Sequence, residues 1–260
     1  MHDPLAKFVR RHDPDRFFTA LFAPAARRGA LLALYAFNHE LARAREAARE
    51  PGLALIRLHW WREVVEGTEK RHEVATPLSA VLNHGELDRG DLLALIEARE
   101  IEAEPAIPDL GTWRSYLLGT AGGLAVAAAR SLGTAEPETL RPLGAAYGVA
   151  GVIRSVPALA RQQRCLLPED VLAAAGLVAE GVILRPEMPQ LSEVRTVLIG
   201  EGRKMLGAGR VPAGAIAAAL PAVFGRRDLN RLAALRTLPP HGRGIGDKLA
   251  VLVAAVSGRV

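Results

Sequence analysis

Asn38, His39 and Glu40 form a polar cluster that could offer hydrogen-bonding groups to a ligand. They interrupt residues 30–50, ALLALYAFNHELARAREAARE, whose first half is apolar and whose second half is charged. On a helix, such a cluster could present polar groups to an internal cavity, or it could be a polar stripe that faces solvent. These residues alone leave both interpretations open.

The sequence shows few other residues in patterns typical of catalysis or metal binding. The single cysteine, Cys165, excludes an internal disulfide, and no cluster of Cys and His has zinc spacing. The formal net charge of +5 comes from scattered arginines rather than from a block of like charges, so we expect no nucleic-acid partner. A basic surface permits attraction to anionic lipid, to a diphosphate or to an acidic protein, and does not choose among them.

The polar cluster must be positioned by the helix predicted over residues 30–50. Its apolar residues recur at mixed helical spacings, the run contains no internal proline or glycine, and Pro51-Gly52 ends it. The remaining helices are expected over residues 15–22, 53–70, 76–83, 91–104, 111–131, 142–162, 191–208, 212–224 and 246–256, with another beginning at Pro168. Residues before Asp13 are expected to form a short helix or a loose arm.

Two of these predicted helices, 111–131 and 142–162, are unusually rich in glycine. Each glycine costs roughly 1 kcal/mol relative to alanine inside a helix, so close packing or a cavity is expected to offset the cost. The two helices could therefore pack backbone to backbone.

The composition predicts an all-α fold. Half of the residues are hydrophobic but only 5% are aromatic, which suits a core of closely packed Ala, Leu and Val. The 260 residues are enough to bury a full core, and we expect one domain, residues 1–260, with eight to ten helices. The start lacks an apolar signal core, and uncharged runs such as 211–225 are too short to span a bilayer. We therefore expect a cytoplasmic protein, with peripheral contact at the inner face of the membrane as a further expectation.

Several motifs, taken in order, resemble the squalene and phytoene synthase family. That resemblance implies the all-α isoprenoid-synthase fold, with helices 30–50 and 142–162 facing each other across a central cavity. The family's enzymes condense two prenyl diphosphates, and Mg²⁺ bridges the diphosphates to two aspartate-rich motifs. The motifs that carry the resemblance are Phe22-Ala-Pro, ALYAF at 33–37, RLHWWRE at 57–63, IEARE at 96–100, YLLGTAGGL at 116–124 and LPED at 167–170.

The sequence departs from the family at both aspartate-rich motifs. In the first, this chain has Ala42 and Arg43 and keeps one carboxylate, Glu46. In the second, the arginine is kept as Arg154, but the two aspartates are replaced by Ser155 and Leu159. A glutamine and an asparagine that usually precede that arginine are replaced by Gly148 and Gly151.

Positive charge is added near the first motif by Arg43 and Arg45. If they faced inward, they would oppose metal binding, since like charges about 4 Å apart repel by about 4 kcal/mol at an effective dielectric of 20. The resemblance therefore implies no metal site, no catalytic residue and no cofactor. The resemblance also implies that Tyr116, Arg154 and His12 lie near the place where the enzymes hold the diphosphate or the intermediate, so these three and Glu46 are the ligand-binding candidates.

Within the family, AFNHELA followed by RLHWWREVVEG looks most like the branch that includes a mitochondrial complex I assembly factor, which also lacks the aspartate motifs. The first hypothesis is thus a pseudoenzyme that assists assembly of a membrane respiratory complex and has that complex's subunits as partners. The alternative is a Mg²⁺-dependent prenyl-diphosphate transferase of the squalene or phytoene synthase type. A third interpretation, which overlaps with the first, is a membrane-surface module that holds an isoprenoid ligand in the cavity.

Overall fold

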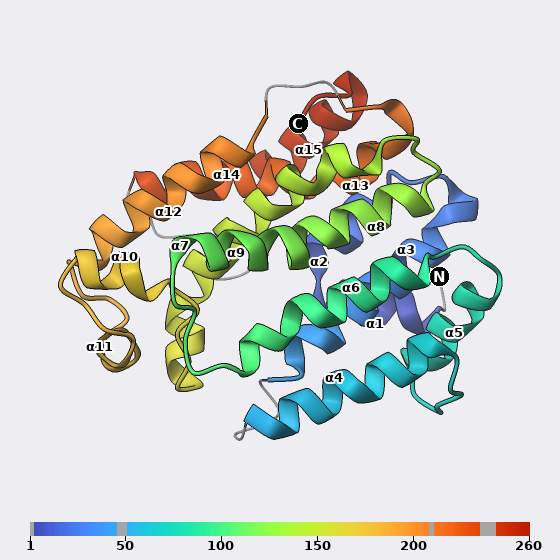
Figure 1. The fold of residues 1–260 in the computed structure, drawn as a ribbon. Helices are drawn as coiled ribbons and strands as arrows, with labels where there is room; N and C mark the ends of the chain where they lie inside the picture. Colours follow the sequence, from blue (N-terminus) through green and yellow to red (C-terminus); the bar gives the residue numbers. More distant parts are fainter. Residues whose placement is uncertain (1–2, 46–50, 208–210, 235–242) are drawn as a thin grey trace.

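The computed structural model describes residues 3–45, 51–207, 211–234 and 243–260, and in this part of the chain the fold is all-α, as predicted (Figure 1). An isolated β-bridge joins Ile107 and Pro168. Fifteen α-helices are present in the described ranges, so the expected count of eight to ten is wrong. The excess arises because long predicted helices are divided and short ones were not foreseen.

The first half of the fold comprises α1 (Pro4–His12), α2 (Pro14–Ala20), α3 (Ala25–Arg43), α4 (Pro51–Glu66), α5 (Ala75–Asn83), α6 (Arg89–Arg99) and the 3₁₀-helix η1 (Glu100–Ala103). The middle comprises α7 (Leu110–Leu117), the π-helical turn η2 (Leu118–Gly122), α8 (Gly123–Ser131), η3 (Pro137–Leu140) and α9 (Arg141–Arg161). The last part comprises α10 (Glu169–Ala174), α11 (Ala179–Leu184), α12 (Leu191–Met205), η4 (Ala213–Ala215), α13 (Ile216–Ala219), α14 (Pro221–Ala233) and α15 (Ile245–Ser257).

The N-terminal helices begin at aspartate caps. Oδ1 of Asp3 accepts a hydrogen bond from the backbone N–H of Leu5 at 2.9 Å, and Oδ1 of Asp13 accepts one from Arg16 at 3.1 Å. Pro4 and Pro14 follow these caps, and proline fits a first turn that needs no N–H donor. The stretch before Asp13 is therefore a defined helix, α1, that packs on α3.

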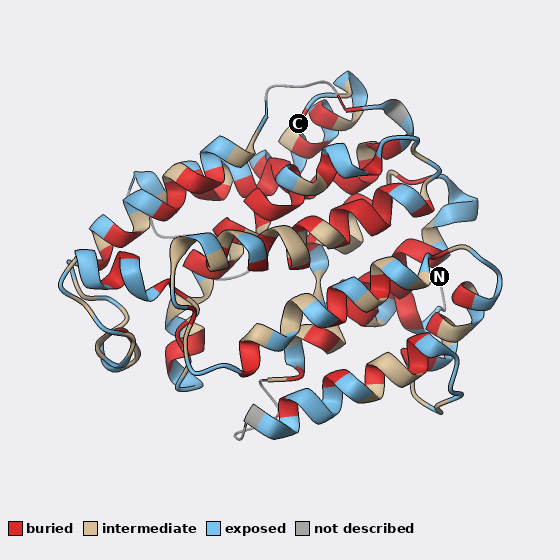
Figure 2. Ribbon diagram, viewed as in Figure 1, coloured by how far each residue is buried: buried red, intermediate tan, exposed pale blue. Residues whose placement is uncertain are grey.

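The long helix α9 is the centre of the fold and packs against α8, α12 and α14. Residues 137–161 are long and apolar enough to cross a membrane, but 61% of their most apolar window is buried inside the protein. This helix owes its apolar character to its position in the core. Figure 2 shows the same arrangement, with buried residues on the helix sides that face inward.

Glycines allow α9 to approach η2 closely, as the sequence predicts. A Cβ atom at Gly144 would lie 2.4 Å from the backbone oxygen of Ala121, and one at Gly122 would lie 2.7 Å from the backbone oxygen of Arg141. Real Cβ atoms do not come so near to backbone, so only glycine fits at these two positions. The conformational cost of the glycines is offset by this packing.

Several predicted helix boundaries are wrong. Residues 111–131 do not form one continuous α-helix, because the π-helical turn η2 divides it where the wall of an internal cavity passes. Residues 212–224 form η4, α13 and the start of α14, which continues to Ala233. Helix α3 ends at Arg43 and α12 ends at Met205, so the predicted ends at residues 50 and 208 are wrong.

Candidate functional site

A cavity of about 330 Å³ lies between α3 and α9. Residues of α2, α6, η1, α7, η2 and the turn after α9 also line it. Its lining includes Leu117 and Val152 from one hydrophobic cluster and Tyr147 from the other, so it lies where the two clusters meet. The prediction that the helices around 30–50 and 142–162 face each other across a central space is confirmed.

Five positions of the family's motifs line this cavity: Ala42, Gly148, Gly151, Ser155 and Leu159. Arg43 does not face the cavity, so the condition under which it would oppose metal binding there is not met. The Arg43 side chain is about half exposed and lies 3.7 Å from Glu40, and it borders a separate surface depression beside Trp60. The helix turns between Ala42 and Arg43, so one faces the cavity and the other faces outward.

One side of the cavity is built around Glu102. Its carboxylate accepts a hydrogen bond from the Tyr116 hydroxyl at 2.8 Å and pairs with Arg99 at 2.7 Å and with Arg164 at 3.2 Å. Arg99 also donates to the side-chain oxygen of Asn38 at 3.1 Å. Burial, together with the adjacent carboxylate, raises the pKa of the Tyr116 hydroxyl above its usual value, so the phenol stays protonated.

Arg164 is held there by the way α9 ends. The N–H of Arg164 donates to the oxygen of Leu159 at 2.9 Å, and the N–H of Gln163 donates to the oxygen of Ala160 at 3.0 Å. This is a Schellman motif, and it places Gln163 at φ +58°, where glycine is usually found. The turn aims the Arg164 guanidinium back at Glu102.

A second part of the wall is built around Arg16. Its guanidinium donates to Oδ2 of Asp13 at 2.8 Å and lies over the ring of Tyr147 at 4.8 Å. Burial alone would lower the pKa of Arg16, but Asp13 and the two neighbouring tyrosines outweigh burial and raise it above its usual value. Arg16 is therefore a fixed cation in the wall.

Arg154, the retained arginine of the second motif, lines the cavity, and its guanidinium is bound by a buried aspartate. Its Nη1 donates to Oδ2 of Asp228 at 2.8 Å. Arg243 joins the same buried group, since it pairs with Asp228 and with Asp15 at 2.5 Å each. The Tyr147 hydroxyl donates to Asp15 at 3.0 Å, which connects this group to the cavity wall.

His39 lines the cavity, and His12 lies behind it. The two rings are stacked with centroids 4.6 Å apart. Burial first, and then the charges of His12 and Arg43, lower the pKa of His39 to about 4. Within the described chain its buried Nε2 has no hydrogen-bond partner. His39 is therefore neutral at physiological pH.

The structure brings together two of the four predicted ligand-binding residues, Tyr116 and Arg154, in the cavity lining. His12 does not line the cavity but stacks on His39, which does. Glu46 lies outside the described residues. Of the polar cluster on α3, Asn38 and His39 line the cavity. The interpretation of that cluster as a stripe facing solvent is wrong for these two residues.

Sequence reasoning missed the charged residues that surround them. Arg99 and Glu102 belong to a stretch that was interpreted as a strongly charged helix, yet both side chains are almost entirely buried. Their spacing of three residues with opposite charge, like that of Asp13 and Arg16, was a signal that could have indicated a pair. The additional wall residues are Asp13, Arg16, Arg99, Glu102, Tyr147 and Arg164.

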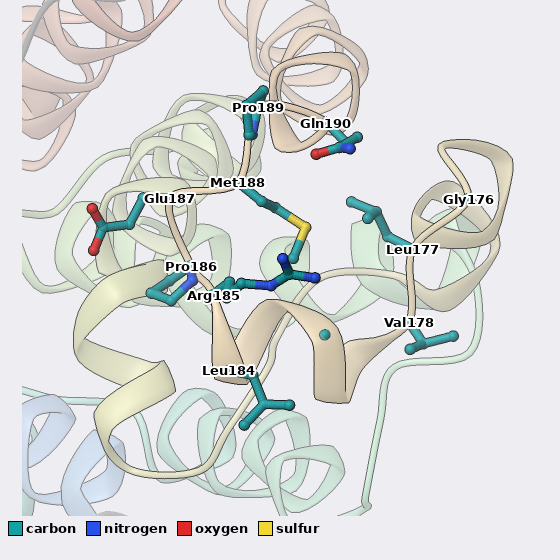
Figure 3. A pocket seen from close by; sticks show the side chains of 11 residues that line it. Gly176, Leu177, Val178, Leu184, Arg185, Pro186, Glu187, Met188, Pro189 and Gln190 are labelled. Carbon is teal, nitrogen blue, oxygen red and sulfur yellow. The ribbon is translucent and has the colours of Figure 1, made fainter.

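Two further observations delimit the site. Among the described residues, no group of three or more His, Cys, Asp or Glu side chains is arranged to hold a metal ion. A larger hollow of about 760 Å³ lies elsewhere, and all its lining residues come from the single stretch between Gly176 and Gln190. Figure 3 shows Arg185 and Met188 at its centre. Residues from the family's motifs converge on the central cavity instead.

The fold defines this chain as a helical protein of the isoprenoid-synthase class. It superposes on a dehydrosqualene synthase with a TM-score of 0.76 and 14% identity, covering 97% of this chain and 94% of that one. It superposes on squalene synthase HpnC from Alicyclobacillus acidocaldarius with a TM-score of 0.61 and 16% identity, covering 98% and 92%. At these identities the likeness shows the fold alone.

The particular family follows from the sequence match. The squalene/phytoene synthase model matches residues 9–241, and the chain belongs to this family. It is 23% identical over 196 residues to the human NADH dehydrogenase (ubiquinone) complex I assembly factor 6, and 27% identical over 188 residues to the Drosophila melanogaster homologue. These alignments cover 72% and 67% of this chain, and only 59% and 56% of the relatives' own lengths.

Proposed function

We propose that this chain is a non-catalytic member of the squalene/phytoene synthase family that assists assembly of respiratory complex I. The observation that carries the proposal is the chemistry of the cavity at the motif positions. Ala42, Gly148, Gly151, Ser155 and Leu159 line it, and none of these side chains is a carboxylate. Mg²⁺ requires oxygen ligands, chiefly carboxylates, to hold a diphosphate in a site of this kind.

The charge of the lining supports the same conclusion. Four arginines, Arg16, Arg99, Arg154 and Arg164, face two carboxylates, Asp13 and Glu102, among the described lining residues. Both carboxylates are already paired with arginine. Four positive charges against two negative charges leave a net charge of +2, which repels a divalent cation and attracts an anion.

The link to complex I rests on the relatives. Assembly factors named for this complex align with about two thirds or more of the chain, and none of the retained features requires prenyl transfer. Since a shared fold does not fix a function, the assembly role needs a cellular test.

Deletion of the gene in the organism of origin is that test. We expect assembled complex I and its NADH oxidation to fall, while squalene, hopanoid and carotenoid levels stay constant. Expression of the wild-type chain and of Tyr116→Phe should restore complex I equally, because the proposal assigns the Tyr116 hydroxyl no catalytic step. Loss of isoprenoid products with normal complex I would contradict the proposal.

An assay with purified protein tests the enzymatic alternative directly. Incubation with farnesyl or geranylgeranyl diphosphate and Mg²⁺ should give no product above a control without protein. Turnover that disappears in Arg154→Ala would establish the Mg²⁺-dependent transferase instead.

A second candidate function, binding of an anionic isoprenoid without chemistry, is favoured by the mixed wall of the cavity. Arginines occupy one part of the wall, while Leu117, Val152 and Leu159 supply apolar surface. Farnesyl diphosphate without Mg²⁺ should then raise the melting temperature of the wild-type protein but not that of Arg154→Ala, and no shift in either protein would exclude this function.

A further inference from the structure

Helix α15 has an apolar face that the described part of the chain leaves exposed. Five of its aliphatic side chains are between 43% and 90% exposed. They recur at spacings of four, three, one and three residues, so they share one side of the helix. These side chains, here called the outer face of α15, are Ile245, Leu249, Leu252, Val253 and Val256.

The opposite side of α15 already fixes the helix to the protein. Val251 and Ala254 are buried in the main core, and α15 packs on α14. Asp247 is buried and pairs with Arg227 at 2.5 Å and with Arg231 at 2.6 Å. Core packing therefore explains one side of this helix and leaves the outer face unexplained.

The exposed charged side chains of α15 and of the three residues after it are of one sign. The carboxylate side chains of residues 211–260 are those of Asp228 and Asp247. Both carboxylates are buried in ion pairs. Lys248 and Arg259 are exposed, and Lys248 follows Ile245 by three residues, so it lies at the edge of the outer face. An apolar strip bordered by cations results.

We propose that the outer face of α15 binds the surface of an anionic lipid bilayer. The helix has 13 residues and is about 20 Å long, too short to cross a hydrocarbon core of about 30 Å. It would lie in the plane of the membrane, with its aliphatic side chains among the upper acyl chains and Lys248 and Arg259 at the lipid phosphates.

The same observations favour lipid over a second copy of the chain. A dimer through this face would bring the cations of two copies together, and like charges across an interface oppose association. The side chains of the outer face are purely aliphatic and carry no hydrogen-bonding group, so they suit a fluid partner that needs no fixed polar contacts.

The position of α15 makes this orientation accessible. The helix and the C-terminus lie at one edge of the molecule, and α4 lies at the other (Figure 1). A membrane on the α15 side would lie at the edge away from α4, on which Leu53, Leu55 and Ile56 are exposed. Those three residues provide a control surface for the test.

Vesicle flotation with the full chain tests the proposal. We expect the wild-type protein to float with vesicles of phosphatidylcholine mixed with phosphatidylglycerol, and to bind pure phosphatidylcholine vesicles more weakly. The triple variant Leu249→Gln/Val253→Gln/Val256→Gln should lose about ten-fold or more in affinity, since a few buried methylene groups are worth that factor. Lys248→Gln/Arg259→Gln should abolish the preference for anionic vesicles.

The matched control changes apolar residues of similar exposure on α4, Leu53→Gln/Leu55→Gln/Ile56→Gln, and should bind vesicles like the wild type. The proposal is overturned if the wild type does not float, or if the α4 variant loses as much binding as the α15 variant. A change from dimer to monomer in the α15 variant with unchanged flotation would assign the face to a second copy. This test does not depend on the proposed role in complex I assembly.

Discussion

Arg154 and Asp228 are joined by a hydrogen bond of 2.8 Å that ties the cavity wall on α9 to α14. The two partners differ in their surroundings. The Arg154 side chain is 37% exposed, whereas that of Asp228 is 1% exposed and is shared by Arg231 and Arg243. The arginine is therefore one of several partners of a buried anion.

This asymmetry predicts unequal effects of substitution. Asp228→Asn should lower the free energy of unfolding by about 3–5 kcal/mol, because it leaves buried arginines without their counter-charge. Arg154→Ala should cost about 1 kcal/mol or less, because Asp228 keeps two other partners and Arg154 is partly exposed. Urea denaturation of both variants checks this, and equal losses would show that Arg154 is the essential partner.

Gly148 and Gly151 on α9 should respond differently to alanine. A Cβ at Gly148 would lie 2.7 Å from the Cβ of Ala121, whereas a Cβ at Gly151 meets nothing within 4 Å. Both substitutions replace glycine by alanine and so gain the same helix propensity. The difference between the stabilities of the two variants therefore measures the cost of overpacking at Gly148. We expect Gly148→Ala to be less stable than Gly151→Ala by about 1–3 kcal/mol in thermal or urea unfolding. If the two variants are equally stable, η2 lies farther from α9 than the structure shows.

The neutral His39 predicts a dependence of stability on pH. Its pKa in the folded protein, about 4, lies below its ordinary value of 6.5, so folding favours the unprotonated ring. The contribution of His39 is fully present above about pH 6.5 and is lost as the pH falls from 6.5 towards 4. The stability of His39→Gln should fall less than that of the wild type over this range, and parallel curves from urea denaturation would contradict the assignment.

Gln163 occupies the left-handed region at φ +58°. A side chain there costs about 1 kcal/mol, so Gln163→Gly should raise the free energy of unfolding by about that amount. The neighbouring Gln162→Gly is the control, since Gln162 has φ −93° and gains nothing from glycine. Equal effects of the two substitutions on the melting temperature would argue against a Schellman turn at this place.

Much of the fold was predictable because local patterns decide it. Pro142 and Gln162 were expected to bound the central helix, and α9 runs from Arg141 to Arg161. The end of α14 was predicted wrongly, since the helix was expected to end at residue 224 and α14 continues to Ala233. Asp228, in this continuation, is buried because arginines distant in sequence neutralise it. No local pattern contains that information.

The candidate site was also only partly predictable, because the sequence does not show which distant residues meet. Family likeness placed Tyr116 and Arg154 near the cavity, and both line it. It did not indicate Glu102 or Arg164, which lie 62 residues apart and meet only through the turn at the end of α9. Whether Arg43 faces the cavity was left open, because the sequence does not show where the cavity wall ends along α3. Charged residues that look solvent-exposed in the sequence can be paired and buried in the folded protein.

The unequal space around Gly148 and Gly151 also bears on evolutionary reversibility. The family resemblance implies that amide side chains once stood at these two positions. At Gly151 the space is still open, so a single substitution could restore a polar group there. At Gly148 the methyl group of Ala121 has closed the gap, and a larger side chain could return only if α9 and η2 first moved apart. The return of a polar side chain to the cavity is therefore blocked at Gly148 and possible at Gly151.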